Sequence, residues 1–262
     1  MQHGVLERMR AIEESHWWFR ARQEILLSLM HRWVPAGSRI LDVGCGTGYF
    51  LHAAQQQWEA WGLDPAPEAV AYCQGRGLNR VSVGSVADLG KPSWPRFGAI
   101  CFFDVLEHLD DDLGALKATA AMLSPGGLVL ATVPAYKWLW SSHDTQNHHR
   151  RRYTRGMLQK VLEQAGFRPL ELGYYNSRLF PLALVQRTVD RIRPRPAAEH
   201  LPVPPSFVNE ALYRVLKSER RRLTGAEPKP FSYGLSLLAV AQVRGNGVLS
   251  EGDVVSSYTN TR

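Results

Sequence analysis

Short β-rich runs alternate with helical patterns along much of the chain, and this alternation limits the possible folds more than any other feature. The strand candidates are Arg39–Val43, Trp58–Asp64, Arg80–Ser85, Ala99–Asp104, Gly127–Pro134 and Pro169–Tyr175. The helix candidates are Arg22–Trp33, Thr47–Gln57, Pro67–Gly75, Leu113–Leu123 and Thr154–Ala165. Strands separated by helices of this length form parallel sheets with helices on both faces. The sequence therefore predicts a doubly wound α/β fold.

A glycine-rich turn follows the first strand candidate. In "RILDVGCGTGYFL", residues 39–51, an apolar run is followed by glycines at the alternate positions 44, 46 and 48. Glycine lets a backbone approach a ligand closely, and the N-terminus of the next helix offers free N–H groups. Asp64 ends the second strand candidate, 20 residues after Gly44, where a carboxylate can bind ribose hydroxyls. The turn thus favours a nucleotide-like ligand.

Two simpler or different interpretations of this turn stay open. The dinucleotide fingerprint G-x-G-x-x-G/A fits less well, because the pattern here is G-x-G-x-G followed by Tyr49. The turn could also hold no ligand, with Asp42 binding only the amides of its own loop. An NAD enzyme and a catalytically silent regulator therefore remain as alternatives of a different class.

Composition narrows the class of protein. The chain has 262 residues, 45% of them apolar, which suffices for one packed α/β domain with additions. Its three cysteines, Cys45, Cys73 and Cys101, are too scattered for a disulfide framework, which favours a reducing compartment. The N-terminus has no apolar signal-peptide region, and no apolar run approaches the ~20 residues that span a bilayer. We expect a cytoplasmic protein.

The ordered set of motifs resembles class I S-adenosylmethionine-dependent methyltransferases. "ILDVGCGTG" is similar to the first motif of that family, "WGLDP" to its second-strand acid and "GSVADL" to its loop after strand three. "FFDVLEHL" resembles the end of strand four, and "LSPGGLVLATVP" the lead into strand five. The resemblance covers roughly residues 39–134. It implies a Rossmann-like, mostly parallel seven-stranded sheet of order 3-2-1-4-5-7-6. The last strand candidate, about Tyr233–Val243, follows a helical insert, whereas a short hairpin usually joins strands six and seven in the family.

The resemblance also implies S-adenosyl-L-methionine as the cofactor. It places Gly44 and Gly46 at the methionine part, Asp64 at the ribose, Asp88 at the adenine and Phe103 beside the amino-acid moiety or the sulfonium. In related ubiquinone-pathway O-methyltransferases an N-terminal arginine meets the cofactor carboxylate, which makes Arg20 or Arg22 a candidate here. The predicted cofactor-binding residues are Arg22, Asp42, Gly44, Gly46, Asp64, Asp88 and Phe103.

The N-terminal run "HWWFRAR", residues 16–22, resembles a bacterial subgroup of the same family. Its aromatic side chains, Trp17, Trp18 and Phe19, could close over the ligand, and Trp17 is a predicted substrate contact. The alternative is that these rings only pack their helix on the sheet.

The stretch "WSSHDTQNHHRRRYT", residues 140–154, follows the fifth strand at the sheet edge where α/β proteins bind ligands. A general base that takes a hydroxyl proton assists methyl transfer to oxygen, and a histidine suits this role. The candidate bases are His143, His148 and His149; the predicted substrate-binding residues in this stretch are Arg151, Arg152 and Tyr153. The simpler interpretation is a solvated basic loop in which Asp144 pairs with an arginine.

Two neighbouring residues of the fourth-strand motif, Glu107 and His108, either touch the ligand or brace the following helix. Catechol-type methyltransferases use a magnesium ion near this point, but no H-x-x-x-H or C-x-x-C pattern supports a metal here. We therefore expect no metal. The predicted function is methyl transfer to a small molecule, with oxygen (hydroxyl or carboxyl) as the first choice of acceptor atom and nitrogen as the second.

An unusually long insert, residues 176–231, separates the sixth and last strands. It has eleven Lys and Arg against five acids, a difference of +6 where the whole chain has +7. Its proline-rich middle cannot be helical, and after it one helical face is expected to carry Phe207, Val208, Ala211, Leu212, Val215 and Leu216. We favour a lid over the substrate pocket. Contact with the inner face of an anionic membrane, serving a lipid-linked or hydrophobic substrate, is second, and nucleic acid is disfavoured.

The expected organisation is therefore an N-terminal helical cap at residues 1–36, a cofactor-binding core at 37–175, the basic helical insert at 176–231, the last core strand at 232–244 and a flexible tail at 245–262. The identity of the acceptor and the oligomeric state are left open by the sequence.

Overall fold

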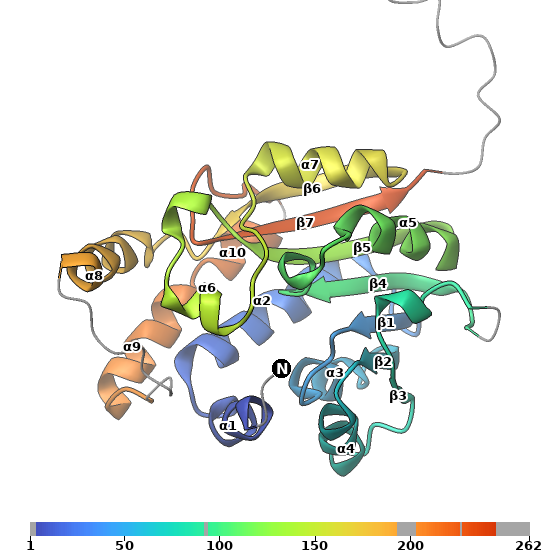
Figure 1. The fold of residues 1–262 in the computed structure, drawn as a ribbon, viewed down its shortest axis with the longest axis horizontal. Coiled ribbons are helices and arrows are strands. Elements are labelled where there is room, and N and C mark those ends of the chain that lie inside the picture. The colour runs from blue at the N-terminus through green and yellow to red at the C-terminus, as the bar shows by residue number, and fades with distance from the viewer. Residues whose placement is uncertain (1–3, 92–93, 193–202, 226, 245–262) are drawn as a thin grey trace, which may run out of the picture.

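The computed structural model describes residues 4–91, 94–192, 203–225 and 227–244. Within these residues one sheet has the strand order β3-β2-β1-β4-β5-β7-β6 (Figure 1). The strands are β1 (Arg39–Val43), β2 (Glu59–Asp64), β3 (Val81–Val83), β4 (Phe97–Phe103), β5 (Leu123–Pro134), β6 (Phe167–Tyr175) and β7 (Ser236–Val243). All neighbours pair in parallel except β7, which is antiparallel to both β5 and β6. The predicted fold class and strand order are confirmed.

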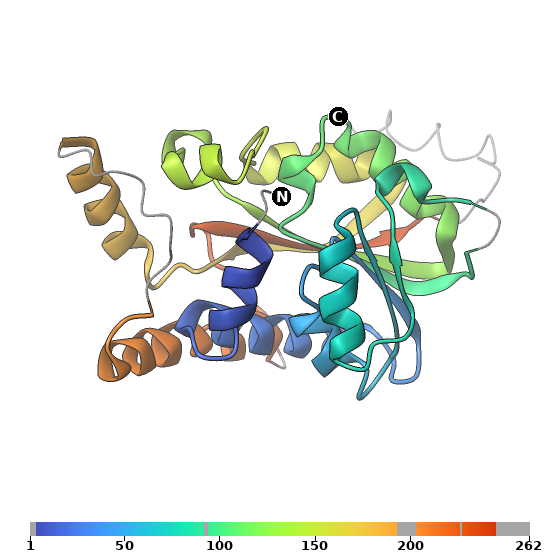
Figure 2. The same cartoon turned by 60° about the horizontal axis from the view of Figure 1, so that its bottom comes forward.

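Helices cover both faces of this sheet. They are α1 (Val5–Ile12), α2 (Trp17–Trp33), α3 (Tyr49–Ala54), α4 (Pro67–Gly75), α5 (Asp112–Met122), α6 (Ser142–Gln146), α7 (Arg155–Gln164), α8 (Phe180–Ile192), α9 (Ser206–Lys217) and α10 (Arg220–Thr224). Short 3₁₀ turns are η1 (Val86–Asp88), η2 (Leu106–His108) and η3 (Lys137–Leu139). Figure 2 shows α2 and α9 on one side of the sheet and α5 and α7 on the other.

The two faces of the sheet have separate apolar cores. On one face, Ile25 and Leu29 of α2 and Leu223 of α10 are buried together with Leu51 of α3. On the other face, Leu116 of α5 and Leu158 of α7 are buried with strand residues. Because β1 and β4 are central and covered on both faces, most of their residues are buried, as expected of central parallel strands. β4 has no polar side chain, whereas β1 buries Asp42 beside Ile40, Leu41 and Val43. This packing fixes the carboxyl ends of β1, β2, β4 and β5 at a common edge.

The insert begins after β6, and its second half packs along α2. Asn209 and Tyr213 of α9 are buried there: the Asn209 amide oxygen accepts the Trp17 N–H at 2.9 Å, and the Tyr213 hydroxyl donates to Glu24. The apolar face predicted for this helix is therefore only partly right. Phe207 is 76% exposed and Val215 37% exposed. The side of α9 that faces α2 is the one with Asn209 and Tyr213, because these two residues hydrogen-bond to α2.

Among the described helices, none combines the length and the apolar character that crossing a bilayer requires.

Candidate active site

The glycine-rich turn lies between β1 and α3. Gly44, Gly46 and Gly48 have left-handed backbones, with φ of 74°, 55° and 76°. A Cβ at position 44 would lie 2.6 Å from a methyl carbon of Val105, so a larger residue does not fit there. A Cβ at position 46 would meet no atom within 4 Å. The loop backbone therefore borders open space at Gly46, which gives a cofactor room to approach the peptide groups.

The acid at the end of β2 is tied to this turn. Asp64 is buried, and its two carboxylate oxygens accept hydrogen bonds from the N–H groups of Gly46 and Ala66, both at 2.9 Å. Each carboxylate oxygen has a second lone pair, so Asp64 can also accept from a ribose hydroxyl. The carboxyl group that fixes the loop is thus the one predicted to hold the sugar.

The other acid of the first motif, Asp42, is buried below the turn. Burial, together with the charge of Asp64, raises its pKa to about 7, although Arg22 acts in the opposite direction. Asp42 is therefore a partly protonated group at neutral pH, unlike an ordinary surface aspartate.

Arg22 of α2 reaches the end of β4. Its Nη2 lies 2.7 Å from Oδ2 of Asp104, and its guanidinium carbon lies 6.0 Å from the ring centre of Phe103. The Nε of Arg22 is buried and has no hydrogen-bond partner among the residues that the structure describes. A buried donor without a partner is costly, so this position suits an anionic ligand group such as the carboxylate of the cofactor. The fold thus brings Arg22 near Phe103, and the contact of either residue with the cofactor stays a prediction.

Asp88 closes the turn after β3. Its carboxylate accepts the Ser85 N–H at 2.7 Å and pairs with Lys91. The contact with adenine that was predicted for Asp88 stays a prediction.

Trp17, the predicted substrate contact, begins α2 and is half-buried, and its backbone N–H donates to the side chain of Asn209.

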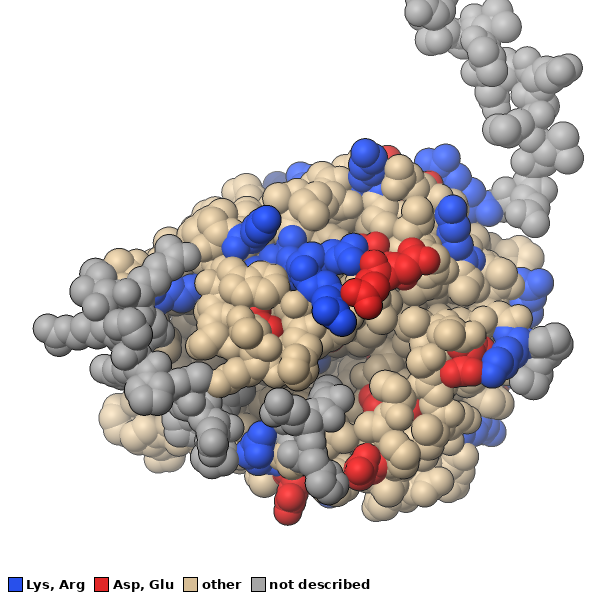
Figure 3. Space-filling model, in the orientation of Figure 1, with Lys and Arg blue, Asp and Glu red and all other residues tan. Residues whose placement is uncertain are grey.

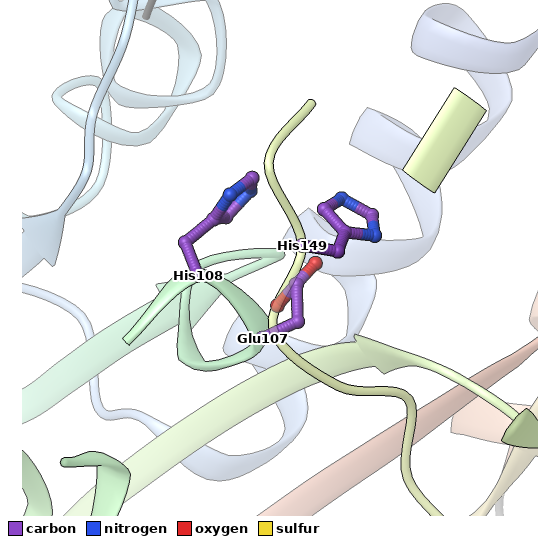
Figure 4. A group of neighbouring side chains, drawn as sticks. All are labelled: Glu107, His108 and His149. Carbon is purple, nitrogen blue, oxygen red and sulfur yellow. The ribbon is translucent and has the colours of Figure 1, made fainter. Parts of the chain in front are cut away.

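A second cluster joins η2 to the loop after α6. Glu107 and His108 of η2 and His149 of the loop each offer a nitrogen or oxygen atom, and these three atoms lie within 4.8 Å of one another (Figure 4). The rings of His108 and His149 are nearly perpendicular, with centres 4.7 Å apart. The Arg150 N–H donates to the Glu107 carbonyl at 2.7 Å and so fastens the loop to η2.

Burial shifts the pKa of two members of this cluster toward their uncharged forms. Burial, reinforced by the charge of Asp104, raises the pKa of Glu107 well above its usual range. Burial, reinforced by His149, lowers the pKa of His108 to about 4. One oxygen of Glu107, Oε2, is buried without a hydrogen-bond partner among the described residues. The cluster therefore combines a carboxyl group and an imidazole, both of which burial favours in their uncharged forms, with His149.

Asp144 of α6 holds His149 in place. Its Oδ1 lies 2.9 Å from Nδ1 of His149 and 2.6 Å from Nε of Arg152, and its Oδ2 accepts from Nη2 of Arg152 at 2.9 Å. Although burial raises the pKa of Asp144, hydrogen bonds from His149 and Arg152 outweigh it and keep that pKa below its usual range. An ionised carboxylate only accepts, so Nδ1 of a neutral His149 carries the proton and Nε2 carries the lone pair.

The other predicted bases are placed differently. His148 is exposed and has a left-handed backbone with φ of 55°. His143 lies on α6, and its side chain is outside the described part of the structure. Of the three predicted bases, the structure thus brings His149 into the cluster.

Three residues predicted to bind substrate have partners within the protein, and their contact with a substrate stays a prediction. Arg152 is buried, and besides Asp144 it donates to the Ala135 carbonyl at 3.0 Å. The buried Tyr153 hydroxyl donates to Asp112 at 2.6 Å. Arg151 donates to the Leu109 carbonyl at 2.9 Å and pairs with Asp112 at 3.1 Å. These contacts fasten the loop to η2 and α5, and Figure 3 shows basic and acidic side chains side by side on this face.

Sequence reasoning missed a link between the N-terminal cap and the glycine turn. Glu13, which is buried just after α1, binds the hydroxyl of Thr47 within the turn and lies 2.5 Å from Nη2 of Arg76. Arg76 also donates to the Thr47 carbonyl at 3.1 Å. The only hint in the sequence is an acidic pair before "HWWFRAR", and nothing in the pattern names Arg76 as its partner.

Glu107, His108 and His149 could also hold a metal ion, because each offers one suitable ligand atom. The expectation of no metal stays a prediction.

Two surface cavities, of about 320 and 360 Å³, are both lined by Trp33 and Leu170. Neither is lined by a residue of the glycine turn or of the histidine cluster.

Comparisons with known proteins find a family model and relatives that match much of this chain. A family model described as "Methyltransferase domain" matches residues 17–172. A Mycolicibacterium smegmatis protein named as a probable S-adenosylmethionine-dependent methyltransferase is 31% identical over 60% of this chain and 61% of its own length. A ubiquinone biosynthesis O-methyltransferase from Xanthomonas axonopodis pv. citri is 36% identical over 38% of this chain and 44% of its own length. Both alignments thus span less than two thirds of the relative.

Among solved structures, a chain from the complex of the Haloferax volcanii Trm112 methyltransferase activator with a methyltransferase has a TM-score of 0.59. It is 20% identical, and the superposition covers 93% of this chain and 96% of that one. This likeness concerns the fold alone.

Proposed function

Because the chain belongs to the family of S-adenosylmethionine-dependent methyltransferases, we propose that it transfers a methyl group to an oxygen atom, hydroxyl or carboxyl, of a small molecule. The observation that carries the choice of oxygen is the Asp144–His149 pair beside the end of β4, 2.9 Å apart. A histidine fixed in one tautomer by an ionised carboxylate is the arrangement that general-base catalysis requires.

The residues of the glycine turn fit the proposed cofactor. The open side of Gly46 gives room for the methionine part of the cofactor, and the lone pairs of Asp64 suit its sugar diol. The Nε of Arg22, which has no hydrogen-bond partner among the described residues, suits its carboxylate. When bound, S-adenosylmethionine supplies a methyl group on a sulfonium, which needs alignment with the acceptor more than covalent help. Phe103 is 9% exposed and packs edge-on against Phe50, so it presents a rigid apolar surface at this edge.

His149 would act on the acceptor. Its Nε2 lone pair accepts the hydroxyl proton as the methyl reaches the oxygen, and Asp144 stabilises the imidazolium that results. Burial favours the uncharged forms of Glu107 and His108, which reduces the repulsion between the Glu107 carboxyl group and an oxygen that carries negative charge. Arg152 and Tyr153 hold the loop in position. In the nitrogen alternative a neutral amine attacks directly and His149 matters less.

The hydrophobic character of the acceptor is also proposed. The Tyr136 ring stacks on Tyr174 with centres 5.1 Å apart and on Trp138 with centres 5.6 Å apart. Phe180, which begins α8, contacts the Tyr136 ring edge-on at 6.2 Å. These rings follow β5 and β6 at the same edge as the histidine cluster and supply apolar surface for a hydrophobic or lipid-linked acceptor. They also support the interpretation that the insert borders the acceptor as a lid.

The decisive test is turnover with a panel of phenols, carboxylic acids and amines. We expect S-adenosylhomocysteine to form together with a product that carries one more methyl group on oxygen. His149→Ala should lose most turnover while binding S-adenosylhomocysteine normally, and His148→Ala serves as the matched control. Methylation of amines alone, undisturbed in His149→Ala, would establish the nitrogen alternative.

The same assay separates a base from a metal. If His149 acts as the base, dialysis against a chelator leaves turnover unchanged. Loss of turnover that added magnesium or zinc restores would instead assign the three-residue cluster to a metal.

A further inference from the structure

The helix α8 exposes an unusual amount of apolar surface. Leu182 is 57% exposed, Val185 62% and Val189 41%. These three residues are spaced three and four apart, which places them on one side of a helix. Scattered exposed apolar residues are normal on a protein surface, but a contiguous stripe of large ones on a single helix marks an interaction surface. We call these three residues the α8 stripe.

The helix that carries the stripe stands apart from the domain. Figures 1 and 2 both show α8 projecting beyond the sheet and its covering helices. Its first residue, Phe180, is anchored by edge-on ring contacts with Trp138 at 6.2 Å and Tyr233 at 5.4 Å. The described body of the protein therefore leaves the stripe uncovered, and it does so beside the aromatic rings at the edge of the candidate active site.

Basic residues accompany this surface. Arg178, two residues before α8, and Lys137, next to the 53%-exposed Trp138, are both exposed. The insert as a whole has eleven Lys and Arg against five acids. An apolar helical stripe flanked by basic residues, with an exposed tryptophan nearby, matches the chemistry of an anionic bilayer surface: acyl chains, phosphate groups and the polar boundary between them. Nucleic acid would use the charges but leave the apolar stripe in water.

We propose that the α8 stripe, together with Trp138 and the neighbouring basic residues, docks this protein on the surface of an anionic lipid bilayer. Helix α8 lies along the membrane plane with Leu182, Val185 and Val189 in the acyl boundary, and Arg178 and Lys137 at the headgroups. The binding is peripheral. It does not rest on the proposed methyl transfer, since docking requires neither cofactor nor acceptor.

The test is sedimentation of the full chain with sucrose-loaded vesicles. Vesicles of equal parts phosphatidylglycerol and phosphatidylcholine should pellet the protein, and vesicles of phosphatidylcholine alone should pellet much less. Binding should weaken as sodium chloride is raised. The triple variant Leu182→Ser, Val185→Ser, Val189→Ser should lower the partition coefficient at least about tenfold, because three exposed apolar side chains no longer enter the lipid.

The matched control is Met157→Ser, which removes a 48%-exposed apolar side chain from α7 and should bind vesicles like the parent. Circular dichroism and thermal unfolding should be the same for all three proteins, because the changed residues are exposed. Absence of pelleting by the parent, or equal pelleting by the triple variant, would overturn the proposal. So would a dimer in light scattering that the triple variant abolishes, since the stripe would then bind a second copy.

Discussion

Oδ1 of Asp144 lies 2.9 Å from Nδ1 of His149, and the same carboxylate accepts hydrogen bonds from Nε and Nη2 of Arg152. Asp144 therefore cannot turn away from the histidine without breaking two charge-assisted hydrogen bonds. The orientation of the proposed base is thus set by a buried ion pair and not by the surface loop that carries it.

The first prediction concerns this pair. Asp144→Asn should lower kcat by about 10²-fold or more, because the amide no longer fixes the Nε2 lone pair of His149. Affinity for S-adenosylhomocysteine, measured by calorimetry, should stay within a factor of two or so of the parent value. The change also removes the negative charge that pairs with the buried Arg152, so it could destabilise the fold. Thermal unfolding of the variant therefore shows whether the loss of kcat reflects catalysis or misfolding. Unchanged kcat in a folded variant would remove Asp144 from the mechanism.

The second prediction concerns the acid at the end of β2. Asp64→Ala should weaken binding of S-adenosylhomocysteine by about a hundredfold, because it removes both the acceptor for the sugar and the anchor of Gly46. The control is Glu59→Gln on the same strand, which lies at its other end and pairs with Arg39 at 3.2 Å. Calorimetric titration gives both affinities. Tight binding in Asp64→Ala, or a preference for NAD in the parent, would contradict the family's cofactor here.

The third prediction concerns stability and pH. The pKa of Asp42 rises from 3.8 to about 7 on folding, chiefly through burial, so the folded state binds the proton more tightly than the unfolded state. The free energy of unfolding should therefore fall as pH rises from 4 to 7, by at most about 4 kcal/mol from this residue. Asp42→Asn carries no charge at any pH and should match the parent near pH 4 but be more stable at pH 8.

Urea unfolding of the cofactor-free protein at several pH values measures this difference. Asp110→Asn, whose side chain is 82% exposed in the parent, is the control and should follow the parent curve. If the gap between Asp42→Asn and the parent stays constant from pH 4 to 8, Asp42 does not titrate in this range.

The fourth prediction concerns the link between the cap and the turn. Within the described part of the chain, Glu13→Ala leaves the guanidinium of Arg76, whose side chain is 7% exposed, with only the exposed Glu14 as an acidic partner. Breaking a buried pair in this way should cost about 3 kcal/mol of unfolding free energy. Because Thr47 also loses its hydroxyl partner, cofactor affinity should fall as well. Glu7→Ala, an exposed change on α1, should alter neither quantity in urea unfolding or calorimetry.

The fold could be predicted closely because its signals are local. Glycines and prolines end the strands and helices, so Arg39–Val43 and Pro67–Gly75 have the predicted bounds. The order of the sheet came from the family resemblance. The two largest differences are elements that begin earlier than predicted. α2 already begins at Trp17 and not at Arg22, because the His16 side chain caps it by accepting the Trp18 N–H. β5 already begins at Leu123, because that residue pairs with Phe97 of β4 before the turn that the glycines make.

The candidate site was predicted less completely because its geometry depends on distant contacts. The sequence predicted three candidate bases without ranking them. The structure singles out His149, because Asp144 bonds to it, while the left-handed backbone at His148 leaves that side chain exposed. Arg152 and Tyr153 look like substrate ligands in a basic loop, but burial directs them to Asp144 and Asp112. Glu13 and Thr47 are 34 residues apart, and no local pattern signals that they meet.

The contact of Glu13 with Thr47 and Arg76 has a practical consequence for work on this family. The region that the family model recognises starts at residue 17, four positions after Glu13. Shortening the gene to those limits would remove Glu13, which contacts the glycine turn through Thr47. It would also leave the buried guanidinium of Arg76 without its carboxylate partner. If a shortened protein then fails to bind the methyl donor, the cause would be the missing Glu13 contact, and the failure would not argue against the methyltransferase assignment.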